Sequence, residues 1–165
     1  MTFGVNYAIF LFKLQLYSSM TVSINVRFFI QPNNSDCTLS DYASRILYQI
    51  YSTEQPQSIL IQCDNQPSAE ELDHAMWHFH PYHFLPHSVS DSTDPLTKPI
   101  HITYQHNPNT DTDICVNYNR PEFQSQARQI IEIIACDEHS KKLARQRYRC
   151  YQQQHATIET HTDVR

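Results

Sequence analysis

A basic and aromatic stripe near the end of the chain holds the residues best placed for binding chemistry. Five of the 12 Lys and Arg residues lie between Lys141 and Arg149. At helical spacing, Lys141, Arg145, Tyr148 and Gln152 share one face. A cation beside an aromatic ring can bind a carboxylate and pack an apolar group at the same time. The pattern indicates a binding surface, and an ordinary solvated basic helix is the alternative.

A histidine-rich segment is the second candidate site. His78, His80, His83 and His87 lie close together in the sequence, and imidazoles at such spacing can bind zinc. Prolines interrupt the segment, the H-E-x-x-H pattern is absent, and no carboxylate is placed to orient the rings. We therefore predict surface or loop histidines rather than a metal site.

The catalytic signals in the sequence are weak. Asp111 and Asp113 have the spacing of strand neighbours on one face or of an ordinary turn, and a nuclease would need further acids nearby. No G-x-S-x-G elbow occurs. The single glycine, Gly4, excludes a P-loop and a dinucleotide-binding loop. We expect no catalytic residue, no cofactor and no metal, and hence no intrinsic activity.

The cysteines and the net charge bear on the cellular compartment and on the class of partner. The five cysteines are odd in number and contain no C-x-x-C pair, which predicts free, mostly buried thiols in a reducing cytoplasm. The net charge of −5 argues mildly against a nucleic-acid grip by the whole surface.

The first nineteen residues differ from the rest of the chain. Their apolar run, Tyr7–Phe12, is too short to span a bilayer, and no Lys or Arg precedes it as in a signal peptide. We interpret residues 1–19 as an N-terminal extension upstream of Met20, and a membrane-contacting helix is the alternative.

The elements that must position these residues alternate along the chain. Strand patterns occupy Val22–Ile30, Ser58–Cys63, Ile100–Tyr104, Ile114–Tyr118 and Ile130–Ala135, the last with a helix as competitor. Helical patterns occupy Leu39–Tyr51, a segment from a capping box at Ser68–Glu71 to about Trp77 or Phe79, Glu122–Arg128 and Asp137–Gln153. Residues 80–99 are predicted to form a long loop, because prolines break any helical period.

This order predicts one α/β domain over residues 20–153, with a mainly parallel, Rossmann-like sheet and no nucleotide-binding loop. Residues 154–165 are predicted to be a polar, frayed tail.

Several segments together resemble a known family. The helix segment Leu143–Tyr151 is similar to the L-A-R-x-R-Y-[KR]-x-Y helix of DNA polymerase III chi subunits. Leu72–Trp77 resembles the family's L-D-x-x-L-W, with Met76 in place of Leu, and Phe84–His87 matches its F-[VL]-P-H. Val26–Phe29 and Leu60–Asp64 resemble its first and second strands. The likeness runs from about Val22 to Tyr151 in the right order, so the set is specific although no single motif is.

The resemblance implies an adaptor protein of bacterial DNA replication. Two partners follow from it: the psi subunit of the clamp loader, and the acidic, phenylalanine-ended tail of single-stranded-DNA-binding protein. The positions that match the family's tail site are Lys141, Arg145, Tyr148 and Ile134, and those that match its psi site are Trp77 and Phe84. DNA would be contacted only indirectly, and no membrane is implied.

Three alternatives stay open on the sequence. The basic helix could bind single-stranded DNA directly, with Tyr148 and Tyr151 stacking on bases. The histidine segment and the two aspartates could serve a hydrolase or nuclease. Trp77 could also be a core residue that closes the second helix rather than an interface anchor.

Overall fold

A seven-stranded sheet forms the centre of the molecule in a computed structural model that describes residues 23–33, 36–89, 98–105 and 111–162. Its strands are β1 (Asn25–Ile30), β2 (Ile59–Cys63), β3 (His87–Val89), β4 (Ile100–Thr103), β5 (Ile114–Tyr118), β6 (Gln129–Ile134) and β7 (Thr157–His161). The spatial order is β3-β4-β2-β5-β6-β1-β7, and the described pairings are all parallel. The predicted α/β class with a mainly parallel, Rossmann-like sheet is confirmed.

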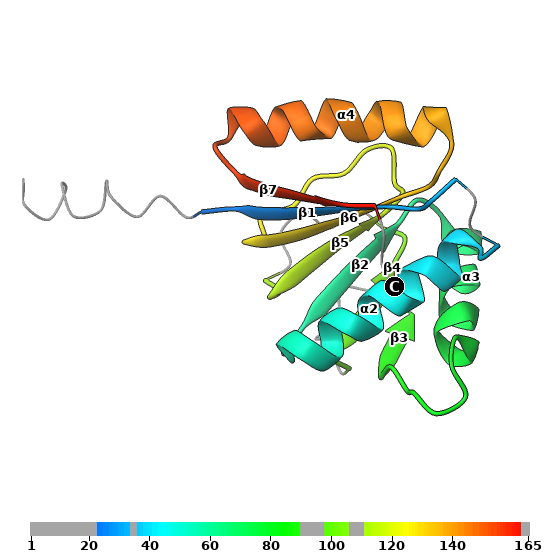
Figure 1. Cartoon of the computed structure of the whole chain (residues 1–165). Coiled ribbons are helices and arrows are strands. Elements are labelled where there is room, and N and C mark those ends of the chain that lie inside the picture. Colours follow the sequence, from blue (N-terminus) through cyan, green and yellow to red (C-terminus); the bar gives the residue numbers. More distant parts are fainter. Residues whose placement is uncertain (1–22, 34–35, 90–97, 106–110, 163–165) are drawn as a thin grey trace, which may run out of the picture.

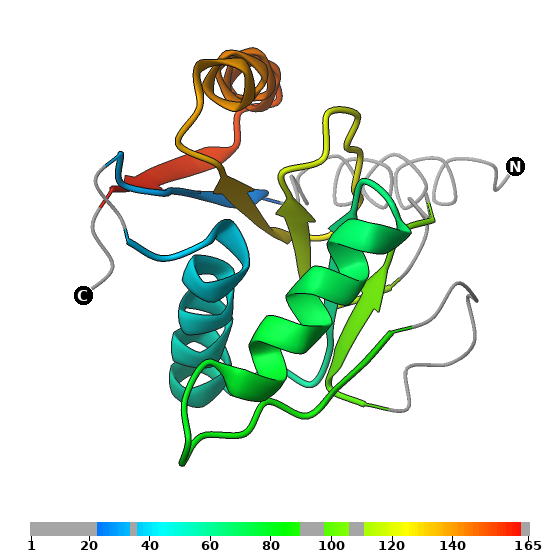
Figure 2. The ribbon, with the colours of Figure 1, turned by 90° about the vertical axis from the view of Figure 1, so that its right-hand side faces the viewer.

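Helices cover both faces of this sheet (Figures 1 and 2). Helices α2 (Leu39–Glu54) and α3 (Gln66–His78) lie together on one face, and α4 (Glu138–Gln153) lies on the other. Because both faces are covered, the central strands read as nearly continuous apolar runs such as Ile59–Cys63, which is buried throughout.

Alternation along β1 and β6 divides the core between the two faces. Val26 and Phe28 pack with Ala144 and Tyr151 on the α4 side, whereas Phe29 packs in the larger cluster beneath α2 and α3. In β6, Ile130, Glu132 and Ile134 follow the same period toward α4. The sheet therefore presents a mixed apolar and charged face to α4.

Each described helix begins at a side-chain cap. Thr38 and Asp41 form a capping box at α2, and the Asp137 carboxylate accepts the Ser140 N–H at α4 over 2.9 Å. Hydrogen bonds from the backbone and side chain of Ser140 hold the pKa of the Asp137 carboxyl below its usual range. Helix α3 begins before the predicted capping box, because the Asn65 side chain accepts the Ser68 N–H over 3.0 Å.

Three other sequence predictions are wrong. Residues 122–128 form no helix, and Phe123 packs against both the α4-side cluster and the small cluster of Leu60, Cys115 and Ala127. The predicted loop 80–99 contains β3 at one edge of the sheet. The predicted frayed tail contains β7, which pairs with β1 from Asn25↔Thr157 to Phe29↔His161 at the other edge.

The predicted extension, residues 1–19, lies outside the described residues. Among the residues that are described, no helix has the length and apolar character needed to cross a membrane.

Candidate functional site

Helix α4 brings the predicted tail-site residues to a groove between itself and the sheet. The groove has a volume of about 490 Å³ and includes Ile134, Lys141, Arg145 and Tyr148, the four positions singled out in the sequence. Six further residues complete its lining: Phe28, Ile30, Ala144, Arg149, Gln152 and Thr160. We call this the α4 groove.

The floor of the α4 groove is apolar and aromatic. The rings of Phe28 and Tyr148 lie 5.6 Å apart at 52°, and Ala144 packs with Phe28 in the buried cluster beneath them. Ile134 is fully buried at the end of β6. Such a floor suits an apolar side chain inserted from outside.

Two cations at the rim of the groove, Arg145 and Lys141, differ in exposure and in their partners. The Arg145 guanidinium lies 3.6 Å from the Glu138 carboxylate, but its side chain remains 62% exposed and Glu138 is 80% exposed. This pair is open to solvent, so a second carboxylate can compete for Arg145 at small cost. Lys141 is more enclosed, because its Nζ donates to Asn33 Oδ1 over 2.7 Å and its side chain is only 18% exposed.

A buried polar network beneath α4 was missed by sequence reasoning. The Arg147 guanidinium donates through Nε to both oxygens of Glu132 over 3.0 Å, and its Nη1 donates to the Arg120 carbonyl over 3.3 Å. Tyr151 Oη and Asn117 Nδ2 each donate to the same carboxylate over 2.8 Å. Burial raises the pKa of Glu132, and the Arg147 guanidinium opposes that shift.

This network keeps the Tyr151 side chain buried beneath α4. Its side chain is buried against β6, so it cannot stack on a base as the direct DNA-binding alternative requires. Burial and the Glu132 carboxylate also raise the pKa of the Tyr151 hydroxyl. Its role is to hold α4 on the sheet.

A second surface lies at the far edge of the sheet, where α3 ends and β3 begins. Trp77 is 54% exposed and Phe84 is 60% exposed, and their rings lie 5.4 Å apart. Tyr82 and Val89 add further exposed apolar area nearby in the chain. The alternative of a core Trp77 is therefore wrong, and we call these residues the Trp77–Phe84 surface.

The histidines between these residues pack against aromatic rings. His83 Nδ1 lies 2.7 Å from the Tyr48 hydroxyl, and the His80 and His83 rings lie 4.1 Å apart. His78 and His74 stack on each other along α3. Within the described ranges no three His, Cys, Asp or Glu side chains gather as a metal site would require.

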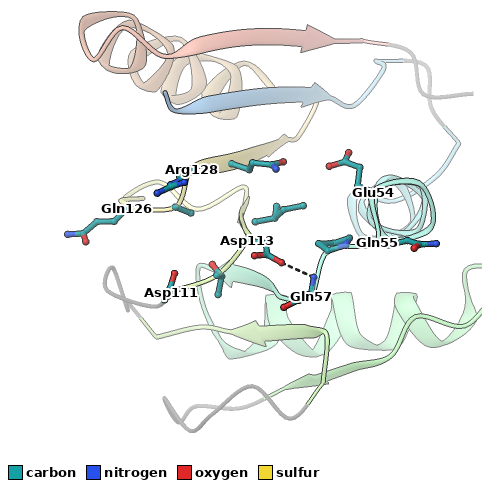
Figure 3. A pocket seen from close by; sticks show the side chains of 12 residues that line it. Glu54, Gln55, Gln57, Asp111, Asp113, Gln126 and Arg128 are labelled. Atoms are coloured by element: carbon teal, nitrogen blue, oxygen red, sulfur yellow. Dashed lines mark hydrogen bonds between the residues drawn. The ribbon is translucent and has the colours of Figure 1, made fainter. Parts of the chain in front are cut away.

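The two aspartates line a cavity of about 840 Å³ at the amino ends of β2, β5 and β6 (Figure 3). Asp113 accepts hydrogen bonds from the N–H groups of Gln57 (2.7 Å) and Ser58 (3.3 Å), so it ties the start of β5 to the start of β2. In open parallel sheets, ligands bind at the carboxyl ends of the strands. This cavity lies at the amino ends. Asp113 is thus engaged in a structural contact.

The cysteines show a range of burial. Cys63 and Cys115 are buried, Cys37 and Cys136 are half-buried, and Cys150 is exposed on α4. Burial raises the pKa of Cys63 to about 12 and that of Cys115 to about 11, which makes both poor nucleophiles.

Comparison with known proteins agrees with the motifs and the fold. The family described as "DNA polymerase III chi subunit, HolC" matches residues 24–159. A DNA polymerase III subunit chi from Haemophilus influenzae is 28% identical over 126 residues, which is 74% of this chain and 86% of that protein. The subunit chi from Pseudomonas aeruginosa is 21% identical over 138 residues, covering 82% of this chain and 94% of its own.

The subunit chi from Escherichia coli is 25% identical over 96 residues, which is 56% of this chain and 65% of that protein. The family match includes β1, the whole of α4 and part of β7, and therefore most of the α4 groove. The chain belongs to the DNA polymerase III chi subunit family, whose members are accessory subunits of the replicative polymerase.

Proposed function

We propose that this protein is a non-catalytic adaptor that joins the clamp loader, through the psi subunit, to the C-terminal tail of single-stranded-DNA-binding protein. The observation that carries the proposal is the α4 groove, where an apolar floor and an available guanidinium lie side by side. The adaptor acts in the cytoplasm, where the replication complex works.

The α4 groove has the chemistry that an acidic peptide ending in phenylalanine needs. The terminal ring enters over Phe28, Tyr148 and Ile134, where it is removed from water. The terminal carboxylate receives charge-assisted hydrogen bonds from Arg145, which exchanges its exposed contact with Glu138 for the peptide.

Lys141 contributes mainly its charge. Its Nζ is held by Asn33, so it adds positive potential toward the acidic residues of the tail without moving. Arg149, at the same rim, extends that potential along the groove.

The Trp77–Phe84 surface is the contact proposed for psi. Exposed aromatic side chains such as this tilted pair are typical anchors of protein interfaces, because they bury a large area at small cost in side-chain entropy. This surface shares no residue with the α4 groove, so one chain can hold both partners at once.

A bridging assay tests the proposal. Psi fixed to beads is expected to retain single-stranded-DNA-binding protein only when this chain is added. A free peptide with the tail sequence should release it, and the same peptide without its final Phe should not. Retention without the chain, or equal release by both peptides, would contradict the proposal.

A second assay tests the direct DNA-binding alternative. The chain alone is titrated with a labelled oligonucleotide at low and physiological salt. Tight oligonucleotide binding that is lost in Arg145→Ala would favour direct DNA binding over recognition of the tail.

A further inference from the structure

Strand β7 leaves one edge of the sheet open. It is the last strand in the order β3-β4-β2-β5-β6-β1-β7, and it pairs with β1 from Asn25↔Thr157 to Phe29↔His161. Within the described parts of the chain, no strand pairs with its other side. Such an edge presents a row of backbone N–H and C=O groups, with which an added peptide strand can form hydrogen bonds.

The register of the pairing identifies the backbone groups that face outward. The Thr157 N–H donates to the Ile24 carbonyl over 2.8 Å, so the backbone groups of Thr157 point toward β1. Successive residues of a strand direct these groups to opposite sides. Ile158 and Thr160 therefore direct their N–H and C=O groups to the open edge. Among the described residues, no hydrogen bond uses the backbone groups of these two residues.

The side chains of the same two residues face α4. Ile158 packs against the α4-side core cluster, and Thr160 lines the α4 groove. The alternate residues lie on the opposite face, where the His161 ring stacks on Phe29 and His161 Nε2 lies 3.6 Å from Glu159 Oε2. The acidic side chain of β7 thus lies away from the groove. Thr160 contributes its side chain to the groove and its backbone to the open edge, so the two are continuous.

The cations of α4 suit an acidic peptide that follows β7. Residues 154–156 join α4 to β7, so the helix and the strand run in opposite directions (Figure 1). The path along α4 from Arg145 to the exposed Arg149 therefore leads back toward the start of β7. A peptide with its terminal carboxylate at Arg145 and its preceding acidic residues near Arg149 runs parallel to β7, as the described strands do.

We propose that the residues preceding the final Phe of the acidic tail add one parallel strand to the open edge of β7, through the backbone groups of Ile158 and Thr160. The inference rests on the proposed binding of that tail in the α4 groove. The final Phe turns over β7 into the groove, where its ring and carboxylate give specificity. The backbone hydrogen bonds add affinity that does not depend on the tail's sequence, and they fix the direction in which the tail leaves the groove.

The first test removes an outward N–H from the protein. Thr160→Pro deletes this donor without removing a hydrogen bond to β1, and edge strands accept proline where the N–H faces outward. It should weaken binding of the tail peptide about five-fold, as for one lost backbone hydrogen bond. Thr160→Val is the matched control, because it keeps the N–H and the side-chain shape. It should bind within about two-fold of the wild type, and melting temperatures check that both variants fold.

The second test uses the wild-type chain, so that folding of a variant plays no part. Tail peptides are prepared with one backbone amide N-methylated at a time. In an added strand every second amide faces β7. Methylation should therefore weaken binding about five-fold at alternate positions before the final Phe and change it little at the positions between them. Losses that do not alternate, or no losses at all, would overturn the added strand.

The outcomes separate the added strand from the proposed function. The added strand alone is overturned if binding needs the final Phe but Thr160→Pro and Thr160→Val bind equally well. The groove assignment and the added strand fall together if the peptide binds equally well without its final Phe. Sedimentation of the free chain tests a second copy as the occupant of the edge. A dimer that Thr160→Pro abolishes and the tail peptide leaves intact would assign the edge to that copy and overturn the proposal.

Discussion

At the scale of single residues, Arg145 is the side chain on which the proposed tail recognition should depend most. Its guanidinium is exposed at the rim of the α4 groove and is paired, among the described residues, with the exposed Glu138 carboxylate. Arg145→Ala should weaken binding of a tail peptide by about 2–3 kcal/mol, as expected when one partner of a charge-assisted pair is removed. Arg145→Lys should recover only part, because an ammonium cannot make the planar two-point contact. Titration of a labelled peptide at several salt concentrations measures both.

Lys142→Ala is the matched control, because it removes a charge from the same helix without lining the groove. It should leave peptide affinity almost unchanged. Lys141→Ala should cause a small loss with a shallower salt dependence, since it acts through potential. Tyr148→Ala should weaken binding with little change in the salt response. Wild-type affinity in Arg145→Ala would rule out this assignment.

Helical spacing was enough to find the residues of one wall of the groove. Lys141, Arg145 and Tyr148 share a face in any helix, whatever lies beneath it. Phe28 and Thr160 could not be found in this way, because they come from strands at opposite ends of the sequence. Only the pairing of β1 with β7 brings them together.

At the scale of elements, the buried pair of Glu132 and Arg147 fixes α4 on the sheet. Arg147→Ala should lower the free energy of unfolding by about 3–5 kcal/mol, because it leaves a buried carboxylate without its charge partner. Burial already raises the pKa of Glu132, and loss of the guanidinium should raise it further. Denaturant unfolding of the variant measures the change.

The pH dependence of Arg147→Ala follows from the direction of that shift. A carboxyl whose folded pKa is raised contributes stability that is full below its unfolded pKa and is lost as pH rises through the folded pKa. The variant should therefore be less destabilised at about pH 5 than at about pH 8. A double variant, Glu132→Gln with Arg147→Met, should recover much of the stability and lose this dependence. An equal loss at both pH values would contradict the account.

Helices and strands were predictable where the apolar periodicity and the capping residues agree. They were not predictable where only pairing of the backbone with another strand stabilises the element. The central strands and α2 carry strong apolar patterns and were found with small errors at their ends. Strand β7 is polar and mostly exposed, so its sequence gives no apolar alternation, and its pairing with β1 stabilises it. Phe123 and Ala127 have helical spacing, but they pack against the same small core cluster from a segment that forms neither helix nor strand.

At the scale of the whole molecule, the two proposed binding surfaces lie at opposite edges of the sheet. The Trp77–Phe84 surface adjoins β3, and the α4 groove includes Thr160 of β7. Helix α3 and helix α4 also cover opposite faces (Figure 2). Trp77→Ala and Phe84→Ala should each weaken psi binding by about 2 kcal/mol or more and leave tail binding unchanged.

Calorimetric titration of each variant with psi and with the tail peptide checks this independence. Arg145→Ala supplies the reciprocal control, since it should weaken the tail contact and leave psi binding as in the wild type. Loss of both contacts in Trp77→Ala, together with a lower melting temperature, would show that the residue supports the fold instead.

The position of β1 also has a consequence for the newly made chain. It is the first described strand to leave the ribosome, yet its two neighbours in the sheet, β6 and β7, are the last two described strands. Pairing of β1 must therefore wait until β6 and β7 have been made, and such long-range pairing is slow. The Trp77–Phe84 surface is translated much earlier, whereas the α4 groove is assembled from both ends of the domain. A chain that stops before β7 would lack a complete groove, so under the proposed function it could not hold the tail of single-stranded-DNA-binding protein.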